Sequence, residues 1–150
     1  MTDTTVPHTI VVGVDGSENS VAALHWALAQ ASLRPGTLVN AVLTWAYPVS
    51  TAASYPMGGG LPEAVDMTSN AEASLLRLLD GIEVPEGVEL RPLVREGAAS
   101  SVLIEESRDA DLLVIGRRGH GTLLGLLLGS IANQCTHHAD CPVVVVPHPA

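Results

Sequence analysis

The chain has 150 residues, of which 7 are Lys or Arg and 16 are Asp or Glu, so its formal charge is −9 with neutral histidines. This length suits one domain with a sizeable core, and the acidic balance argues against duplex nucleic acid or an anionic membrane surface as main partner. Every basic residue is an arginine, which excludes a Walker A loop, a pyridoxal Schiff base and a kinase-type ATP anchor, because each needs a lysine.

Apolar runs predict five strands along the chain. They cover residues 9–14, 38–45, 88–94, 111–115 and 142–146. Most of these runs are continuous rather than alternating, which is typical of strands that are buried on both faces of a parallel sheet.

Helical spacing between these runs predicts four helices. Ser17 is the expected N-cap of the first helix, whose apolar face consists of Val21, Leu24, Leu28 and Ala31. The second has the face Met67, Ala71, Leu75, Leu78 and Ile82. The third is expected at about residues 98–107. The fourth is expected at 126–138, with an apolar face of Leu127, Leu128, Ile131 and Cys135.

Strands that alternate with helices over the whole length imply right-handed crossovers and a parallel sheet with helices on both faces. We therefore expect a single doubly wound α/β domain that spans residues 1–150. The prolines and glycines of residues 46–62 prevent regular structure there. This segment is expected to be a flexible surface loop or a lid.

The chain start has neither the positive region nor the apolar run of a signal peptide, and no run approaches the ~18 apolar residues of a membrane span. A cytoplasmic location is therefore expected. Only Cys135 and Cys141 are present, too few for a disulfide scaffold, and both are expected to be reduced.

Small and polar residues follow the first and fourth predicted strands. Asp15, Gly16 and Ser17 follow the first, and a glycine-rich loop at residues 116–121 follows the fourth. Such a loop lets backbone N–H groups approach an anion, and the helix that begins near Gly129 adds the attraction of its positive end. The alternative is that these glycines serve only tight turns that need a positive φ.

The glycine spacing is more informative than the glycine count. Gly116 and Gly119 are separated by two residues, nine more residues lead to Gly129, and Ser130 follows. Together with the segments VVGVDGS, TLVNAV, DADLLVIGRRGHG, LLLGSIANQ and CPVVVVP, this pattern resembles the universal stress protein family over nearly the whole chain. The resemblance implies a five-stranded open-twisted sheet, often in a dimer, and favours the subclass that binds ATP.

Carried over residue by residue, the resemblance implies the following nucleotide contacts. Gly13, Val14 and Asp15 would lie beside the adenosine, and Ala41 would line the adenine pocket. Gly116, Arg117, Gly119 and His120 would surround the ribose and phosphates, and Gly129 and Ser130 would hold the phosphate chain. Ile131 departs from the valine that is commoner in the family, which is a mild change.

Asp15 and the arginine pair each have a second interpretation. Asp15 is the one carboxylate we can place beside the phosphates as a ligand of Mg²⁺, but it could instead cap the neighbouring turn. Arg117 and Arg118 suit a triphosphate, although arginines beside a turn are often only solvated.

Hydrolysis needs a group that orients water and stabilises charge on the transferred phosphoryl group. We find no second carboxylate or glutamine for this role, and His120 is the one nearby titratable candidate, so slow or no turnover is expected. The predicted function is that of an ATP-loaded sensor or signalling module. One alternative is a dimeric interaction domain that binds no nucleotide. Another is a true ATPase or nucleotidyl transferase, which the segment VDGSENS matches poorly.

Three further predictions concern the last third of the chain. Residues 143–146 would lie at a sheet edge, where an apolar strand invites pairing into a homodimer. The cluster Cys135, His137, His138 and Cys141 suggests zinc, but ordinary packing explains it better. Ser130 as a hydrolase nucleophile is disfavoured, because Leu128 and Ala132 replace the flanking glycines of that motif.

Overall fold

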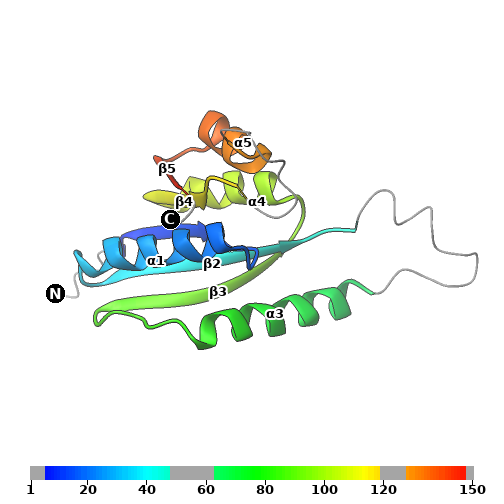
Figure 1. Ribbon diagram of the computed structural model, residues 1–150, viewed down its shortest axis with the longest axis horizontal. Coiled ribbons are helices and arrows are strands. Elements are labelled where there is room, and N and C mark those ends of the chain that lie inside the picture. Colours follow the sequence, from blue (N-terminus) through cyan, green and yellow to red (C-terminus); the bar gives the residue numbers. More distant parts are fainter. Residues whose placement is uncertain (1–5, 48–62, 119–127, 148–150) are drawn as a thin grey trace, which may run out of the picture.

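Five parallel strands form one sheet in the order β3-β2-β1-β4-β5. The computed structural model describes residues 6–47, 63–118 and 128–147. The strands are β1 (Thr9–Gly13), β2 (Thr37–Trp45), β3 (Val88–Glu96), β4 (Leu112–Gly116) and β5 (Val143–Val146). From the central β1 the chain winds outward first to one edge and then to the other (Figure 1). The predicted doubly wound parallel sheet is confirmed.

Helices cover both faces of the sheet. They are α1 (Glu18–Ser32), α3 (Ala64–Asp80), α4 (Ala99–Glu106) with the short 3-10 turn η1 (Ser107–Asp109), and α5 (Ser130–His138). Figure 1 shows α4 and α5 together on one side and α3 beside β3 on the other. Each connection between neighbouring strands is thus a helix that packs back on the sheet.

Each face of the sheet has its own apolar core. Ile10, Val12 and Val39 pack beneath α1 and α3, whereas Val11 and Leu113 pack beneath α4 and α5. Consecutive residues of β1 therefore point into opposite cores, because side chains alternate along a strand. This double burial is the reason why the strand sequences are continuously apolar.

Helix α1 begins where its sequence predicts. The backbone N–H of Ser20 donates to Ser17 Oγ at 3.2 Å, so Ser17 is the N-cap. Of the predicted apolar face, Leu24, Leu28 and Ala31 are buried. In α3, Leu75 of the predicted face is buried, and Met67, Ala71 and Leu78 are partly buried. Ile82, which is also partly buried, lies just beyond the end of the helix.

The last helix differs from the prediction. It begins at Ser130 with Gly129 as N-cap, so Leu128 precedes the helix, while residues 126 and 127 lie outside the described part. Leu128 and Ile131 are exposed, whereas Ala132 and Cys135 are buried. Cys135 of the predicted face is therefore confirmed as buried, whereas Leu128 and Ile131 are not, and Ala132 packs into the core beside Cys135 instead.

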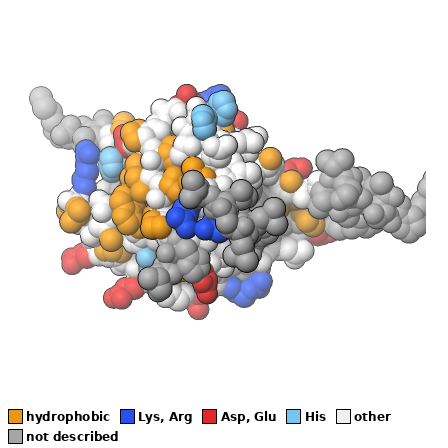
Figure 2. All heavy atoms as spheres, turned by 45° about the horizontal axis from the view of Figure 1, so that its top comes forward, with side chains coloured by type: hydrophobic (Ala, Val, Ile, Leu, Met, Phe, Trp, Pro, Cys, Tyr) orange, Lys and Arg blue, Asp and Glu red, His pale blue; other side chains and the backbone are white. Residues whose placement is uncertain are grey.

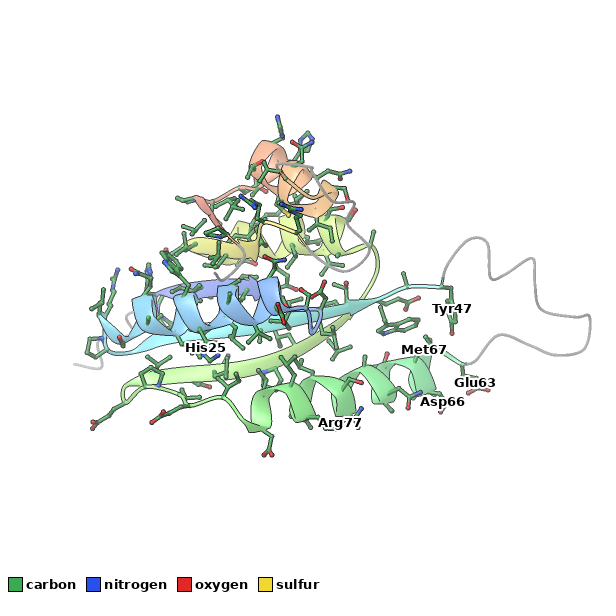
Figure 3. All side chains as sticks on the ribbon, viewed as in Figure 1. His25, Tyr47, Glu63, Asp66, Met67 and Arg77 are labelled. Carbon is green, nitrogen blue, oxygen red and sulfur yellow. The ribbon has the colours of Figure 1, made fainter. Side chains whose placement is uncertain are left out.

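The end of β2 is tied to the first turns of α3. Trp45 Nε1–H donates to Thr68 Oγ1 at 3.1 Å, and the rings of Trp45 and Tyr47 meet edge to face with centroids 5.2 Å apart. Figure 3 shows Tyr47 and Met67 on the elements that face each other here. Of the predicted loop 46–62, residues 48–62 lie outside the described part. Among the described residues, no helix has both the length and the hydropathy of a membrane span.

The two edge strands differ in chemistry. β3 carries Pro92 and several charged residues, including Arg91, whose Nε donates to Glu89 Oε1 at 2.7 Å. β5 consists of four valines and pairs with β4 alone within the described sheet. The predicted edge position of residues 143–146 is thus confirmed.

The two thiols should react at different rates. Burial raises the pKa of Cys135 to about 11, and burial together with the charges of Asp111 and Asp140 raises the pKa of the partly exposed Cys141. Because only the thiolate reacts, native protein at pH 8 should be alkylated by iodoacetamide at Cys141 first, and both sites should react faster as the pH rises. Peptide mapping measures the two rates. Modification of Cys135 as fast as Cys141, with the denatured chain as reference, would contradict this expectation.

Candidate functional site

The carboxyl ends of β1 and β4 meet where the winding of the sheet changes direction. β1 pairs with β2 on one side and β4 on the other. The chain leaves β1 through α1 toward β2, but it leaves β4 through α5 toward β5. Because these two connections diverge, a crevice remains beyond the ends of the two strands.

A cavity of about 680 Å³, open mouth included, occupies this crevice. Most of the predicted nucleotide contacts line it, namely Gly13, Val14, Asp15, Gly116, Arg117, Gly129 and Ser130. Gly119 and His120 lie outside the described residues. The structure thus brings together segments that are about a hundred residues apart in the chain.

The predicted contact at Ala41 requires a correction. The Ala41 side chain is fully buried in the core beneath α1 and α3, on the face of the sheet opposite the cavity. Val42 and Thr44 line the cavity instead. The cause is the alternation of side chains along β2, which places neighbouring residues on opposite faces.

Asp15 lies in a turn that is held by short-range hydrogen bonds. Its Oδ1 accepts from the backbone N–H of Ser17 at 2.9 Å, and its own backbone N–H donates to Ser20 Oγ at 3.2 Å. Ser20 Oγ–H in turn donates to the carbonyl of Ser17 at 3.0 Å, and Gly16 has a φ of 84°, which favours glycine. Asp15 therefore caps this turn, and the same hydrogen bonds hold in place the part of the turn that lines the cavity.

Arg117 joins three parts of the other wall. Its backbone N–H donates to the carbonyl of Val146 at 2.8 Å, and its carbonyl accepts from the N–H of Gly129 at 2.8 Å. Its side-chain Nε is buried and has no hydrogen-bond partner within the described structure. A buried guanidinium nitrogen without a partner is costly in free energy, so this position favours an acceptor supplied by a ligand.

The start of α5 provides further donors. Gly129 has no side chain to cap the helix, and the first-turn N–H groups of a helix have no partner within that helix. Ser130, Ile131 and Ala132 line the cavity. The positive end of the α5 dipole and these backbone groups therefore lie beside Arg117, an arrangement that suits an anion.

Gly116 is required by packing as well as by any ligand, whereas packing against Gly13 can adjust. A Cβ on Gly116 would lie 2.8–2.9 Å from Asn19, including its backbone C and O, so a larger residue would push α1 away from β4. A Cβ on Gly13 would lie 2.8 Å from Leu103 Cδ1, a flexible side-chain end that can move. The glycine at position 116 thus has a structural reason that is independent of binding.

Among the described residues that line the cavity, the charged ones are Asp15, Arg117 and Arg118, so this part of the wall carries one more positive than negative charge. None of the ion pairs between described residues involves Arg117 or Arg118. In a chain with a formal charge of −9, this local excess attracts an anionic ligand to one place.

The two other interpretations gain no support from the described residues. They contain no group of three or more His, Cys, Asp or Glu side chains arranged to hold a metal, and Cys135 is buried in the core beneath α5. No hydrogen bond joins Ser130 to a described histidine, as a serine nucleophile would need.

Several lining residues are absent from the sequence prediction. Ser20, Val42 and Thr44 belong to this group, as do Ala99 and Leu103 from α4. Strand alternation carried a signal for Val42 and Thr44. No feature of the sequence indicated that α4 would line the cavity, because this depends on how a separate helix packs over β1 and β2.

Comparison with known proteins gives the family. Residues 7–147 match the sequence model of the Universal stress protein family. The chain is 32% identical over 153 residues to a universal stress protein of Mycolicibacterium smegmatis, with 97% of this chain and 50% of the relative covered. It is 34% identical over 156 residues to Universal stress protein Rv2623 of Mycobacterium tuberculosis, with 93% and 50% covered. The chain spans about half the length of these curated relatives.

Solved structures agree with the fold. A universal stress protein crystallised in complex with cAMP has a TM-score of 0.66 and 24% identity, over 97% of this chain and 100% of that one. A family member from Arabidopsis thaliana with AMP bound has a TM-score of 0.61 and 20% identity, over 96% and 94%. The five-stranded parallel sheet, its helices on both faces and the match over residues 7–147 lead to one conclusion: the chain belongs to the universal stress protein family.

Proposed function

We propose that this protein binds an adenine nucleotide, with ATP as the favoured ligand, and acts as a sensor or signalling module of the stress response. The observation that carries the proposal is the buried, unpartnered Nε of Arg117 beside the uncapped start of α5. The cAMP and AMP complexes of the two solved relatives support it, since cavities at this switch point bind nucleotides in related folds.

The cavity walls suggest how the nucleotide lies. Val42 and Thr44 from β2 and Ala99 and Leu103 from α4 form a mainly apolar end, whereas Arg117 and the start of α5 form a polar end. β2 and β4 flank β1, so the two ends are separated by about 10 Å, which is two strand spacings. This arrangement suits a base at the β2 end and phosphates at the β4 end.

The contacts of the phosphates follow from this orientation. Arg117 and Arg118 would neutralise phosphate charge, and Ser130 Oγ with the first N–H groups of α5 would donate to phosphate oxygens. Gly13, Val14 and Gly116 would let the ligand approach the strand ends, and Gly129 would leave room at the start of α5. Gly119 and His120 keep their expected places beside ribose and phosphate as part of the proposal.

Asp15 would bind Mg²⁺ if the metal enters with the nucleotide. One carboxylate is enough when phosphates and waters supply the other ligands, although Oδ1 already accepts from Ser17. The described lining holds Asp15 as its one carboxylate. Fast hydrolysis needs a group that orients water, so we propose slow or no turnover, which suits a sensor better than an enzyme.

The second candidate function is an interaction domain that binds no nucleotide. The close approach of Gly116 to Asn19 favours it, because packing alone then explains one glycine of the motif. It leaves the buried Nε of Arg117 unexplained, and for this reason we prefer nucleotide binding.

A homodimer through β5 is part of the proposal. The edge of β5 carries valine side chains that are partly exposed, without the proline and charges that protect β3. Figure 2 shows apolar side chains gathered on the side of the molecule turned to the viewer, with acidic ones along its lower border. Pairing of two β5 strands would cover this edge.

The first prediction from the proposed function concerns the phosphate end of the cavity. Arg117→Met should weaken ATP binding by at least tenfold, because charge-assisted hydrogen bonds are lost, but should change adenosine binding little. Isothermal titration of both ligands measures this difference. Arg77→Met is the matched control, since Arg77 is an exposed arginine of α3 that contacts Ser74.

Native mass spectrometry of the purified protein gives an independent test of the same proposal. Nucleotide carried through purification, or saturable ATP binding in titration, would support it. If wild-type protein carries no nucleotide and shows no binding at millimolar ATP, the proposed function is wrong.

The second prediction concerns the base end. Thr44→Val keeps the shape of the side chain but removes a hydroxyl that can donate or accept a hydrogen bond. It should weaken the binding of adenosine and of ATP alike, by roughly two- to tenfold. Thr37→Val, whose hydroxyl donates to the carbonyl of Arg34 far from the cavity, should leave affinity unchanged. Equal effects of the two variants would show that Thr44 has no contact with the base.

The third prediction concerns the β5 edge. Wild-type protein should have twice the chain mass at micromolar concentration in light scattering, and Val144→Lys should shift it to the monomer by placing charge at the pairing edge. Leu90→Lys places the same charge at the β3 edge and should leave the dimer intact. A monomeric wild-type protein would end the dimer proposal.

A further inference from the structure

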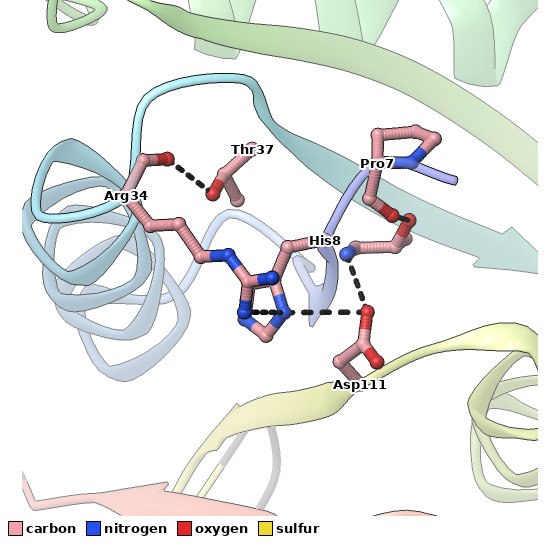
Figure 4. A network of polar contacts seen from close by, with 6 residues as sticks. Pro7, His8, Arg34, Thr37 and Asp111 are labelled. Carbon is pink, nitrogen blue, oxygen red and sulfur yellow. Dashed lines mark hydrogen bonds and ion pairs between the residues drawn. The ribbon is translucent and has the colours of Figure 1, made fainter. Parts of the chain in front are cut away.

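His8 lies at the opposite end of the sheet from the cavity, where the strands begin. Its carbonyl accepts from the N–H of Leu38 at 2.8 Å, which fixes it beside β2. Its side chain reaches toward two oppositely charged groups (Figure 4). They are Arg34, in the turn between α1 and β2, and Asp111, at the start of β4.

Both charged groups approach the same nitrogen atom. His8 Nδ1 lies 3.3 Å from Arg34 Nη1 and 3.3 Å from Asp111 Oδ2. A ring nitrogen either carries a proton and donates, or carries a lone pair and accepts. It therefore cannot accept from the guanidinium and donate to the carboxylate at the same time, so each protonation state satisfies one of the two contacts.

We propose that protonation of the His8 ring changes the hydrogen-bond partner of Nδ1 from Arg34 to Asp111. When the ring is neutral, Nδ1 accepts from the guanidinium of Arg34, and the ring proton is on Nε2. When the ring is protonated, Nδ1–H donates to Asp111 Oδ2, and the positive ring repels Arg34. Histidine is the side chain whose charge ordinarily changes near neutral pH.

The surroundings hold both partners close in either state. Asp111 Oδ2 accepts from the N–H of Thr9 at 2.8 Å, and the N–H of Asp111 donates to the carbonyl of Thr9 at 2.9 Å. The carbonyl of Arg34 accepts from Thr37 Oγ1 at 2.6 Å. The backbones on both sides are thus anchored, so the exchange is confined to the side chains of His8 and Arg34.

Both contacts are partly open to solvent. The His8 side chain is 26% exposed and that of Asp111 is 53% exposed, so solvent screens the two charges. Within the described residues, Arg34 and Asp111 are the charged groups that contact the ring. Cys141 lies beyond Asp111, whose charge helps to raise the pKa of that thiol.

The consequence is a pH-dependent link between elements. At high pH the turn that follows α1 is tied to the start of β1 through Arg34. As the pH falls, that tie is released, and the start of β1 is bound more strongly to β4 through Asp111. Acidification thus shifts a contact from one side of the central strand to the other, at the end of the sheet away from the cavity.

NMR titration of the full-length protein tests this proposal. Long-range proton–nitrogen spectra should show the neutral His8 ring with its proton on Nε2. Arg34→Met removes the positive neighbour and should raise the titration midpoint of His8, whereas Asp111→Asn removes the negative partner and should lower it. Asparagine can still accept from Thr9, so the strand pairing should persist, and the backbone spectrum verifies folding.

The controls separate this local effect from a change in total charge. Arg77→Met removes the same charge from α3 and should leave the His8 midpoint unchanged, and the exposed His25 of α1 should titrate identically in all variants. A neutral ring protonated on Nδ1, or a His8 midpoint that moves in neither Arg34→Met nor Asp111→Asn, would overturn the proposal. So would shifts of equal size in His25.

Discussion

The position of β1 between β2 and β4 is the constraint on which the rest of the structure depends. Because β1 is central, both of its faces are buried, and the side chains on both faces must be apolar. Because its neighbours are reached by connections of opposite direction, a crevice opens at its carboxyl end. A strand that is buried on both faces therefore ends beside the cavity. This arrangement explains why Val14 combines core packing with cavity lining.

The distribution of charge follows the same geometry. The chain as a whole is acidic, yet the arginines at positions 117 and 118 are placed where β4 ends and α5 begins, beside a helix start with no side-chain cap. The general negative charge disfavours polyanions elsewhere on the surface, while the local donors favour a single small anion. The proposed preference for a small phosphorylated ligand would result from the contrast between the two, and neither feature alone would provide it.

The two ends of the sheet have different chemistry because strands in a parallel sheet all run in one direction. At the carboxyl ends, turns and helix starts present N–H groups to a cavity. At the amino ends, side chains of His8, Arg34 and Asp111 contact one another in partly exposed positions. Backbone donors suit a bound anion, whereas side-chain contacts respond to protons. β1 links the two ends through five residues, all of which pair with β2 and three of which also pair with β4.

The sequence by itself determined the fold class and most of the polar site. Continuous aliphatic runs, the cap at Ser17 and the glycine spacing are local features, and local features are sufficient for strand burial, helix starts and anion-binding turns. Side-chain alternation in β2 places Val42 and Ala41 on opposite faces, but only the tertiary structure decided which of the two faces the cavity. It also decided that Leu128 and Ile131 are exposed and that α4 closes one wall. These depend on which face of each element meets its neighbour. That choice is made by packing between segments far apart in the chain, of which a single sequence carries no record.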